Sequence, residues 1–199
     1  MVAAIALQVV WPDTFSVGHY ILPVVEVALL LALSVTTPKE QTFKAPARRL
    51  NVLALIVVAS AANAYALGMI IRQLLTDHVV TDGRALIFAA INIFVTNILI
   101  FALWYWEMDG GGPGERQAIK RYEQDFLFAQ HKNEDYRHPD WKPTFIDYLY
   151  TSATNAMNFA PADATPITRR AKLLMLLQST ISLVTVALVL ARAVGILNS

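Results

Sequence analysis

The sequence predicts an all-α membrane protein, with four transmembrane helices and a re-entrant, pore-like half-helix between the third and the fourth. Three observations lead to this fold class. Hydrophobic residues make up 56% of the 199 residues and gather in long blocks, whereas a soluble domain disperses them. The charged residues, 16% of the chain, lie mainly between these blocks. One further apolar segment, just before the last block, is too short to cross a bilayer.

The long blocks account for most of the chain. Residues 1–18 are apolar but contain Pro12, and we expect an amphiphilic N-terminal segment at the membrane surface. Residues 19–106 then hold three transmembrane helices, and the fourth follows near the C-terminus. Each block has about the 20 residues that a helix needs to cross the hydrocarbon core. The blocks are residues 19–36, 50–75, 85–106 and 173–197. We therefore predict a multi-pass protein of the cytoplasmic (inner) membrane, in contact with the lipid bilayer.

Composition excludes several classes of function. A net charge of +1 argues against an electrostatic binder of nucleic acid. The absence of cysteine removes disulfides, thiolate metal sites and cysteine nucleophiles. The chain has no HExxH metal motif, Gly-rich phosphate loop or nucleophile elbow. We therefore predict no enzymatic activity, no catalytic residue and no cofactor.

Residues 107–143 form the only long polar stretch and are predicted to be a polar or interfacial segment that could contact a protein partner. Within it, Ile119, Tyr122 and Phe126 lie at helical spacing. This spacing predicts a short amphipathic helix over 115–130, either on the membrane surface or packed on its own protein.

Four residues of the polar stretch have the spacing of metal ligands. They could hold a metal on one helical face, but the nearby Pro139 and the charge density favour a solvated loop, so we predict no metal site. These four residues are His131, Glu134, Asp135 and His138.

Residues 144–199 are predicted to hold a pore-like half-helix, a loop and the last transmembrane helix. Residues 144–157 are apolar and aromatic at first, but too short to span. Residues 158–166 contain Pro161 and Pro166 and are predicted to be non-helical. Irregular backbone at membrane depth is tolerated only where protein buries it or where it lines water, so this pattern suggests a pore loop.

Residues 148–172 read YLYTSATNAMNFAPADATPITRRAK and resemble the pore region of tetrameric potassium-type channels. In such channels an aromatic-rich pore helix precedes a filter that ends in Asp, and a Pro, a hydroxyl residue and a basic residue follow. Asp163, Pro166, Thr168 and Lys172 fall in those places. The region is also similar to one in uncharacterised bacterial small membrane proteins, whose final helix carries a run like MLLQSTISLVTVALVLARAVGIL. The resemblance implies a homotetramer that conducts monovalent cations.

The filter positions depart from the channel pattern. Potassium filters have two glycines beside an aromatic residue, and these let successive carbonyls face the ion. Here alanines replace the glycines and Pro161 fixes its own φ. Side chains would then set the preference, which predicts weak potassium selectivity, another permeant species, or a loop that conducts nothing. The candidate pore residues are Thr154, Asn155, Asn158, Phe159, Ala160 and Asp163.

Two further features concern polar groups inside the spans. Gln178, Ser182 and Thr185 lie at i, i+4 and i+7 and share one face of the last helix. Such a stripe either lines a pore or makes hydrogen bonds between helices. Glu26, inside the first predicted span, is a candidate for proton or ion coupling, although it could also reach the interface.

Membrane orientation stays open. Of the 16 Lys and Arg residues, all but Arg72, Arg84 and Arg192 flank the same set of span ends, which places residues 107–172 in the cytoplasm. The channel resemblance implies that the pore loop enters from outside, and an inverted loop, as in glutamate-receptor channels, would reconcile the two. The predicted function is a weakly selective cation pore. The alternative is a non-conducting scaffold or accessory subunit of a larger membrane complex.

Overall fold

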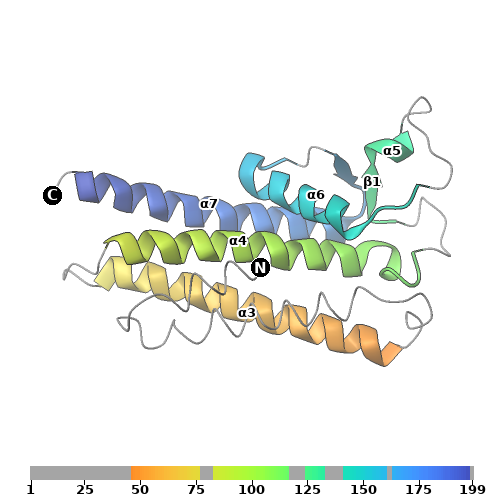
Figure 1. Cartoon of the computed structure of the whole chain (residues 1–199), viewed down its shortest axis with the longest axis horizontal. Coiled ribbons are helices and arrows are strands. Elements are labelled where there is room, and N and C mark those ends of the chain that lie inside the picture. The colour runs from red at the N-terminus through yellow and green to blue at the C-terminus, as the bar shows by residue number, and fades with distance from the viewer. Residues whose placement is uncertain (1–45, 77–82, 117–123, 133–140, 161–162, 198–199) are drawn as a thin grey trace.

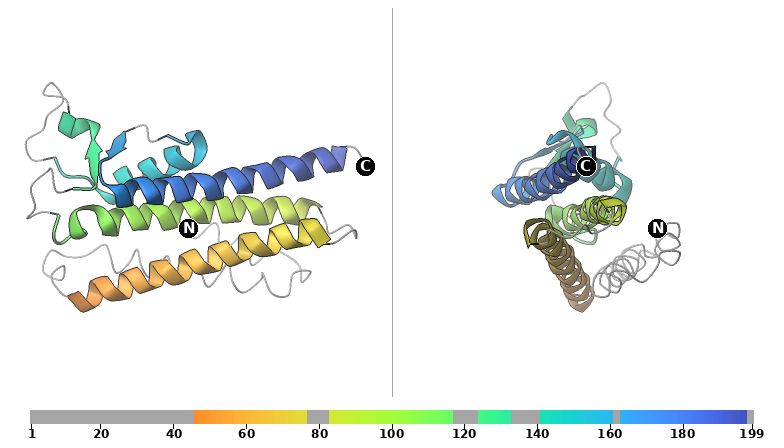
Figure 2. Two further views of the ribbon diagram at one scale, coloured as in Figure 1. Left: turned by 180° about the vertical axis from the view of Figure 1, so that it is seen from behind. Right: turned by 90° about the vertical axis from the view of Figure 1, so that its left-hand side faces the viewer.

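Three long helices lie side by side in the computed structural model, which describes residues 46–76, 83–116, 124–132, 141–160 and 163–197. They are α3 (Pro46–Thr76), α4 (Gly83–Met108) and α7 (Arg169–Leu197). Figure 1 shows α4 between the other two, with both of them antiparallel to it. Figure 2 confirms this order from behind and from one end.

Each of the three helices is long and apolar enough to cross a membrane. The candidate spans are Arg49–Leu74, Leu86–Gly111 and Arg169–Ala191. These correspond to the second, third and fourth predicted spans, which agrees with a multi-pass membrane protein. Many large apolar side chains on their outer faces are exposed, as lipid-facing residues should be. The first predicted span, 19–36 with Glu26, and the predicted segment 1–18 lie outside the described residues.

A shorter helix, α6 (Phe145–Asn158), lies against α4 and α7 at the end of the bundle where α4 ends and α7 begins. Thr144 and Asp147 form a capping box at its start, in which the Thr144 amide donates to Asp147 Oδ2 at 2.6 Å. Its other end stops at Phe159, whose φ of 54° lies in the left-handed region. A short helix followed by non-helical chain is thus present where the sequence predicts it.

The chain returns from α6 to the end of the bundle where α6 began. Strand β2 (Ala164–Pro166) pairs antiparallel with β1 (Phe126–Phe128) and leads into α7. The Asp163 carbonyl also accepts a hydrogen bond from the Ala129 amide at 3.0 Å. The start of α6 and the start of α7 are therefore held at the same end of the bundle.

The amphipathic helix predicted over 115–130 is wrong in the part that the structure describes. Phe126–Phe128 is a strand, and the short helix α5 (Ala129–Lys132) begins only after it. Phe126 and Phe128 alternate along the strand, and both side chains are fully buried. Pairing with a strand that lies far along the sequence overrides the helical spacing of this segment.

An aromatic core joins these elements at the same end of the bundle. The Phe126 ring centroid lies 5.1 Å from that of Tyr105 on α4 and 6.2 Å from that of Tyr148 on α6. The Phe128 ring centroid lies 5.2 Å from that of Tyr148. Trp106 meets Tyr148 edge to face at 5.5 Å. Such contacts favour aromatic pairs beyond the burial of their area, and they hold β1 between α4 and α6.

We expect Phe126→Ala to lower the free energy of unfolding by about 3–5 kcal/mol, because the cavity would lie at the centre of this core. Denaturant unfolding in detergent would measure the loss. The matched control is Ile146→Ala, whose side chain is exposed. Equal losses for the two variants would contradict the assignment of Phe126 to the core.

Candidate functional site

The side chain of Gln178 lies where α4, α6 and α7 meet and is 0% exposed. Its Nε2 donates to the Ser152 carbonyl at 3.0 Å and to the Ser152 hydroxyl at 2.6 Å. Its Oε1 accepts from the Tyr105 hydroxyl at 2.6 Å and from Asn155 Nδ2 at 2.8 Å. A glutamine amide offers two donors and two acceptor positions, so all four are used. We call these four residues the Gln178 network.

The same network holds the middle of α6 deep in the bundle. The Ser152 hydroxyl donates to the Ile98 carbonyl of α4 at 2.7 Å. Asn155 Nδ2 also donates to the Met175 carbonyl of α7 at 3.0 Å, and the Ser179 hydroxyl donates to Asn155 Oδ1 at 3.3 Å. Asn155, predicted to belong to a pore, is therefore bonded on every side within its own chain.

The rest of the polar stripe on α7 is also buried within the chain. Ser182 Oγ accepts from Asn97 Nδ2 of α4 at 3.0 Å, and the Thr185 hydroxyl donates to the Ile181 carbonyl at 2.8 Å. Both side chains are at most 1% exposed. Gln178 and Ser182 thus make hydrogen bonds between helices within one chain, whereas Thr185 bonds a carbonyl of its own helix.

The remaining candidate pore residues lie around the end of α6. The Thr154 hydroxyl donates to carbonyls of its own helix, those of Tyr150 and Thr151. Asn158, Phe159 and Ala160 are exposed, and Asp163 is half-buried. The structure therefore brings only Asn155 together with the stripe of α7.

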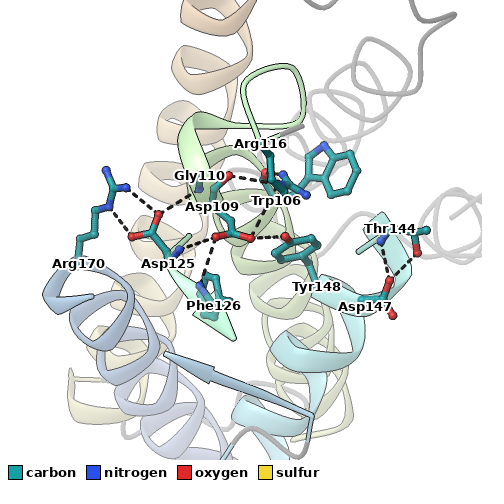
Figure 3. A network of polar contacts seen from close by, with 10 residues as sticks. All are labelled: Trp106, Asp109, Gly110, Arg116, Asp125, Phe126, Thr144, Asp147, Tyr148 and Arg170. Atoms are coloured by element: carbon teal, nitrogen blue, oxygen red, sulfur yellow. Dashed lines mark hydrogen bonds and ion pairs between the residues drawn. The ribbon is translucent and has the colours of Figure 1, made fainter. Parts of the chain in front are cut away.

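A second polar cluster lies at the end of the bundle, around two buried aspartates (Figure 3). Asp109, in the 3₁₀ turn η1 (Asp109–Gly111), accepts the Asp125 amide at 2.6 Å and the Phe126 amide at 3.2 Å on Oδ1. Its Oδ2 accepts the Tyr148 hydroxyl. One carboxylate thereby connects η1, β1 and α6. We call this group, with the arginines described next, the Asp109–Asp125 cluster.

Asp125 connects the cluster to α7. Arg170 donates to its two oxygens from Nε at 2.6 Å and Nη2 at 2.7 Å, which is the strong bidentate arrangement. The Gly110 amide and the Thr168 hydroxyl donate to it as well. Thr168 in turn caps α7, because its Oγ1 accepts the Ala171 amide at 3.3 Å. The residue that matches the hydroxyl position of the channels is therefore a helix cap here.

Arg116 supplies the second positive charge. Its guanidinium lies 4.5 Å from the Trp106 ring centroid and 4.8 Å from that of Tyr148. It donates to the Asp109 carbonyl at 3.2 Å, and its Nε lies 3.8 Å from Asp109 Oδ2. Two arginines thus match two buried aspartates, which makes their burial tolerable. With the charges paired and both carboxylates fully engaged, the cluster is suited to holding elements together.

Metal binding has no support in the part of the chain that the structure covers. No group of three or more His, Asp or Glu side chains is arranged there to hold an ion. Of the four residues with metal-ligand spacing, the side chain of His131 and the whole of Glu134, Asp135 and His138 lie outside the described residues.

Sequence reasoning missed the roles of Asp109, Arg116 and Asp125, because it treated residues 107–143 as a polar or interfacial segment, and it counted Arg170 only as a charge flanking a span. One signal was available in the run of glycines that follows Asp109 directly at the end of an apolar block. Gly111 and Gly112 have φ of 83° and 97°, a conformation that other residues rarely adopt. A Cβ on Gly112 would also lie 3.1 Å from the Glu107 carbonyl oxygen. A turn built this tightly indicates a fixed structure.

Comparison of the chain with protein-family models, with curated proteins and with solved structures found no match. The geometry of these residues is therefore the basis for a functional proposal.

We expect Asp109→Asn to lower the free energy of unfolding by about 3–5 kcal/mol, because Arg116 would lose the charge that balances it in a buried site. The control is Glu115→Gln. The Glu115 side chain is 70% exposed, and its Oε2 lies 3.8 Å from Nη1 of Arg49. An exposed pair of this kind contributes at most about 1 kcal/mol. Thermal unfolding in detergent would compare the two, and a smaller effect for Asp109→Asn would exclude the proposed role.

The buried phenol of Tyr148 should make the stability of the folded protein depend on pH. Burial raises the pKa of its phenol well above the usual value of 10.0; Arg116 acts in the opposite direction and Asp109 adds to the rise. Above pH about 10 the unfolded phenol loses its proton while the folded one keeps it, so stability falls as pH rises. We expect Tyr148→Phe to flatten this alkaline decline and the exposed control Tyr150→Phe to leave it unchanged. Unfolding midpoints between pH 8 and 11 would test this, and an unchanged slope in Tyr148→Phe would refute it.

Proposed function

We propose that the protein is a non-conducting subunit of a membrane assembly, and that copies of the chain assemble through the end of α6. The observation that supports this most is the burial of the polar stripe on α7. Gln178, Ser182 and Thr185 already have partners or packing within one chain. A water-filled pore along this face of α7 would require them to leave those partners.

The depth of α6 supports a protein partner. Ile98 lies near the middle of the candidate span Leu86–Gly111, and Ser152 is bonded to its carbonyl. If α4 crosses the membrane, the last turn of α6 lies near mid-depth, so that α6 is a re-entrant half-helix. The final carbonyls of a helix have no partner within it, and hydrocarbon cannot supply one. Another protein surface, or water, must therefore cover this end.

The exposed side chains near this end favour protein as the cover. Met157 is 60% exposed, and Tyr150 and Phe159 are each about half exposed. Methionine and aromatic residues are enriched in protein interfaces, whereas the polar Asn158 beside them would find no partner in lipid. A homo-oligomer, and the tetramer that the channel resemblance implies, would bring several such ends together.

The proposal includes the orientation of the protein in the membrane and a partner for residues 107–143. We place the end of the bundle that carries the Asp109–Asp125 cluster in the cytoplasm, with the protein in the inner membrane, because basic residues concentrate at that end. A protein partner bound through residues 107–143 stays a prediction. The described part of that stretch is largely buried, with Asp109, Arg116 and Asp125 committed to contacts inside the chain.

A weakly selective cation channel is the second candidate. It is favoured by the exposure of Asn158, Phe159 and Ala160, which an oligomer could arrange around its axis. Asp163, three residues after Ala160, would then add negative charge near the entrance. This candidate requires the permeation path to run between copies of α6 rather than along the buried stripe of α7.

Ion flux in liposomes would decide between the two candidates. We expect no flux of K⁺, Na⁺ or Cl⁻ from the purified, assembled protein, since the buried stripe leaves no continuous polar surface. We also expect Asn158→Ala and Asp163→Asn to lower the yield of cross-linked oligomer, because they alter the proposed contact. Thr180→Ala, on the exposed face of α7, is the control and should assemble normally. Cation flux that changes in Asp163→Asn while the oligomer stays intact would establish the channel instead.

A further inference from the structure

One face of α7 carries two cations above a column of leucines. Its successive residues are three, one, three, seven and seven positions apart, which keeps them on a single side of the helix. The opposite side carries the buried Ala171, Met175 and Gln178, which pack on the rest of the chain. The exposed side is therefore free to contact something outside the chain. We call it the outer face of α7: Arg169, Lys172, Leu173, Leu176, Leu183 and Leu190.

The two cations lie at the boundary of the candidate span. The span begins at Arg169, and Lys172 follows one turn later. Both side chains are exposed, and neither has an acidic partner among the residues that the structure describes. Arg170, between them in the sequence, is held by both oxygens of Asp125 (Figure 3). Two uncompensated positive charges thus lie where a phospholipid headgroup would lie.

The surface toward the middle of the span suits an acyl chain. The four leucines of the outer face are each more than half exposed. From Leu173 to Leu183 the helix rises about 15 Å, which is about the depth of one leaflet. The exposed Thr180 between them donates its hydroxyl to the Leu176 carbonyl at 2.9 Å, so it needs no outside partner. The cations at the boundary of the span and the leucines toward its middle therefore match the headgroup and the acyl chain of a phospholipid.

We propose that the outer face of α7 binds an anionic phospholipid, with Arg169 and Lys172 on its phosphate and Leu173, Leu176 and Leu183 along an acyl chain. Basic residues at the membrane surface attract anionic lipid with about 1 kcal/mol each, or about fivefold in affinity. A zwitterionic lipid brings its own cation and gains less. A second copy of the same face would bring two pairs of like charges together, which opposes that contact. This proposal does not depend on the proposed function.

Native mass spectrometry of the detergent-purified protein would test the site, with phosphatidylglycerol and phosphatidylcholine as the two probes. We expect phosphatidylglycerol to be retained in preference. Arg169→Gln and Lys172→Gln should each weaken its retention by about fivefold, and the double variant by about 25-fold. The matched control is Lys142→Gln, which removes an exposed charge at the same end of the bundle and should retain lipid normally. Circular dichroism and size-exclusion profiles would show that each variant is folded.

Three results would overturn the proposal. The first is equal retention of the two lipids by the wild type. The second is a loss in Lys142→Gln as large as that in Lys172→Gln, which would indicate a general charge effect. The third is displacement of the lipid by inorganic phosphate alone, because the face would then recognise a free anion. Weaker retention of a short-chain phosphatidylglycerol would support the leucines as the acyl-chain contact, and equal retention would exclude them from it.

Discussion

The amide of Gln178 holds three helices together by using every hydrogen-bonding position it has. Its partners come from α4 and α6, and it belongs to α7. Within a bilayer no water can replace a missing partner, so a polar side chain at this depth must be satisfied by protein. The position of α6 follows from this requirement, because Ser152 and Asn155 reach Gln178 only when α6 lies against both α4 and α7.

The buried aspartates of the Asp109–Asp125 cluster must likewise find partners within the protein, and at the end of the bundle these include charged arginines. Its aspartates bind backbone amides of the η1 turn and of β1, and its arginines bring in Trp106, Tyr148 and the start of α7. The aromatic core packs directly beside it, through the contacts of Tyr148 with Phe126 and Trp106. The two polar groups therefore fix α6 at two levels, one beside the middle of the spanning helices and one at their ends.

The sequence was sufficient to predict the elements that depend on composition alone. Long apolar runs predicted α3, α4 and α7, and a short apolar segment followed by prolines predicted α6 and its non-helical continuation. Spacing placed Gln178, Ser182 and Thr185 on one face, yet it could not say whether that face meets water or other helices. The partners of Asp109 and Asp125 lie up to 45 residues away, so no local pattern contains them. Strand β1 was missed for the same reason, since its partner follows it only after α6.

The order of the elements along the chain has a consequence for biosynthesis. Both polar groups that hold α6 include residues of α7, which is made after it: Gln178 for the network and Arg170 for the cluster. While the ribosome still holds α7, Ser152 and Asn155 have no amide to bond at membrane depth. The contacts of α6 with Gln178 and Arg170 can therefore form only when α7 arrives. The joining of α4, α6 and α7 would then be a late step, which also withdraws the polar groups of α6 from water.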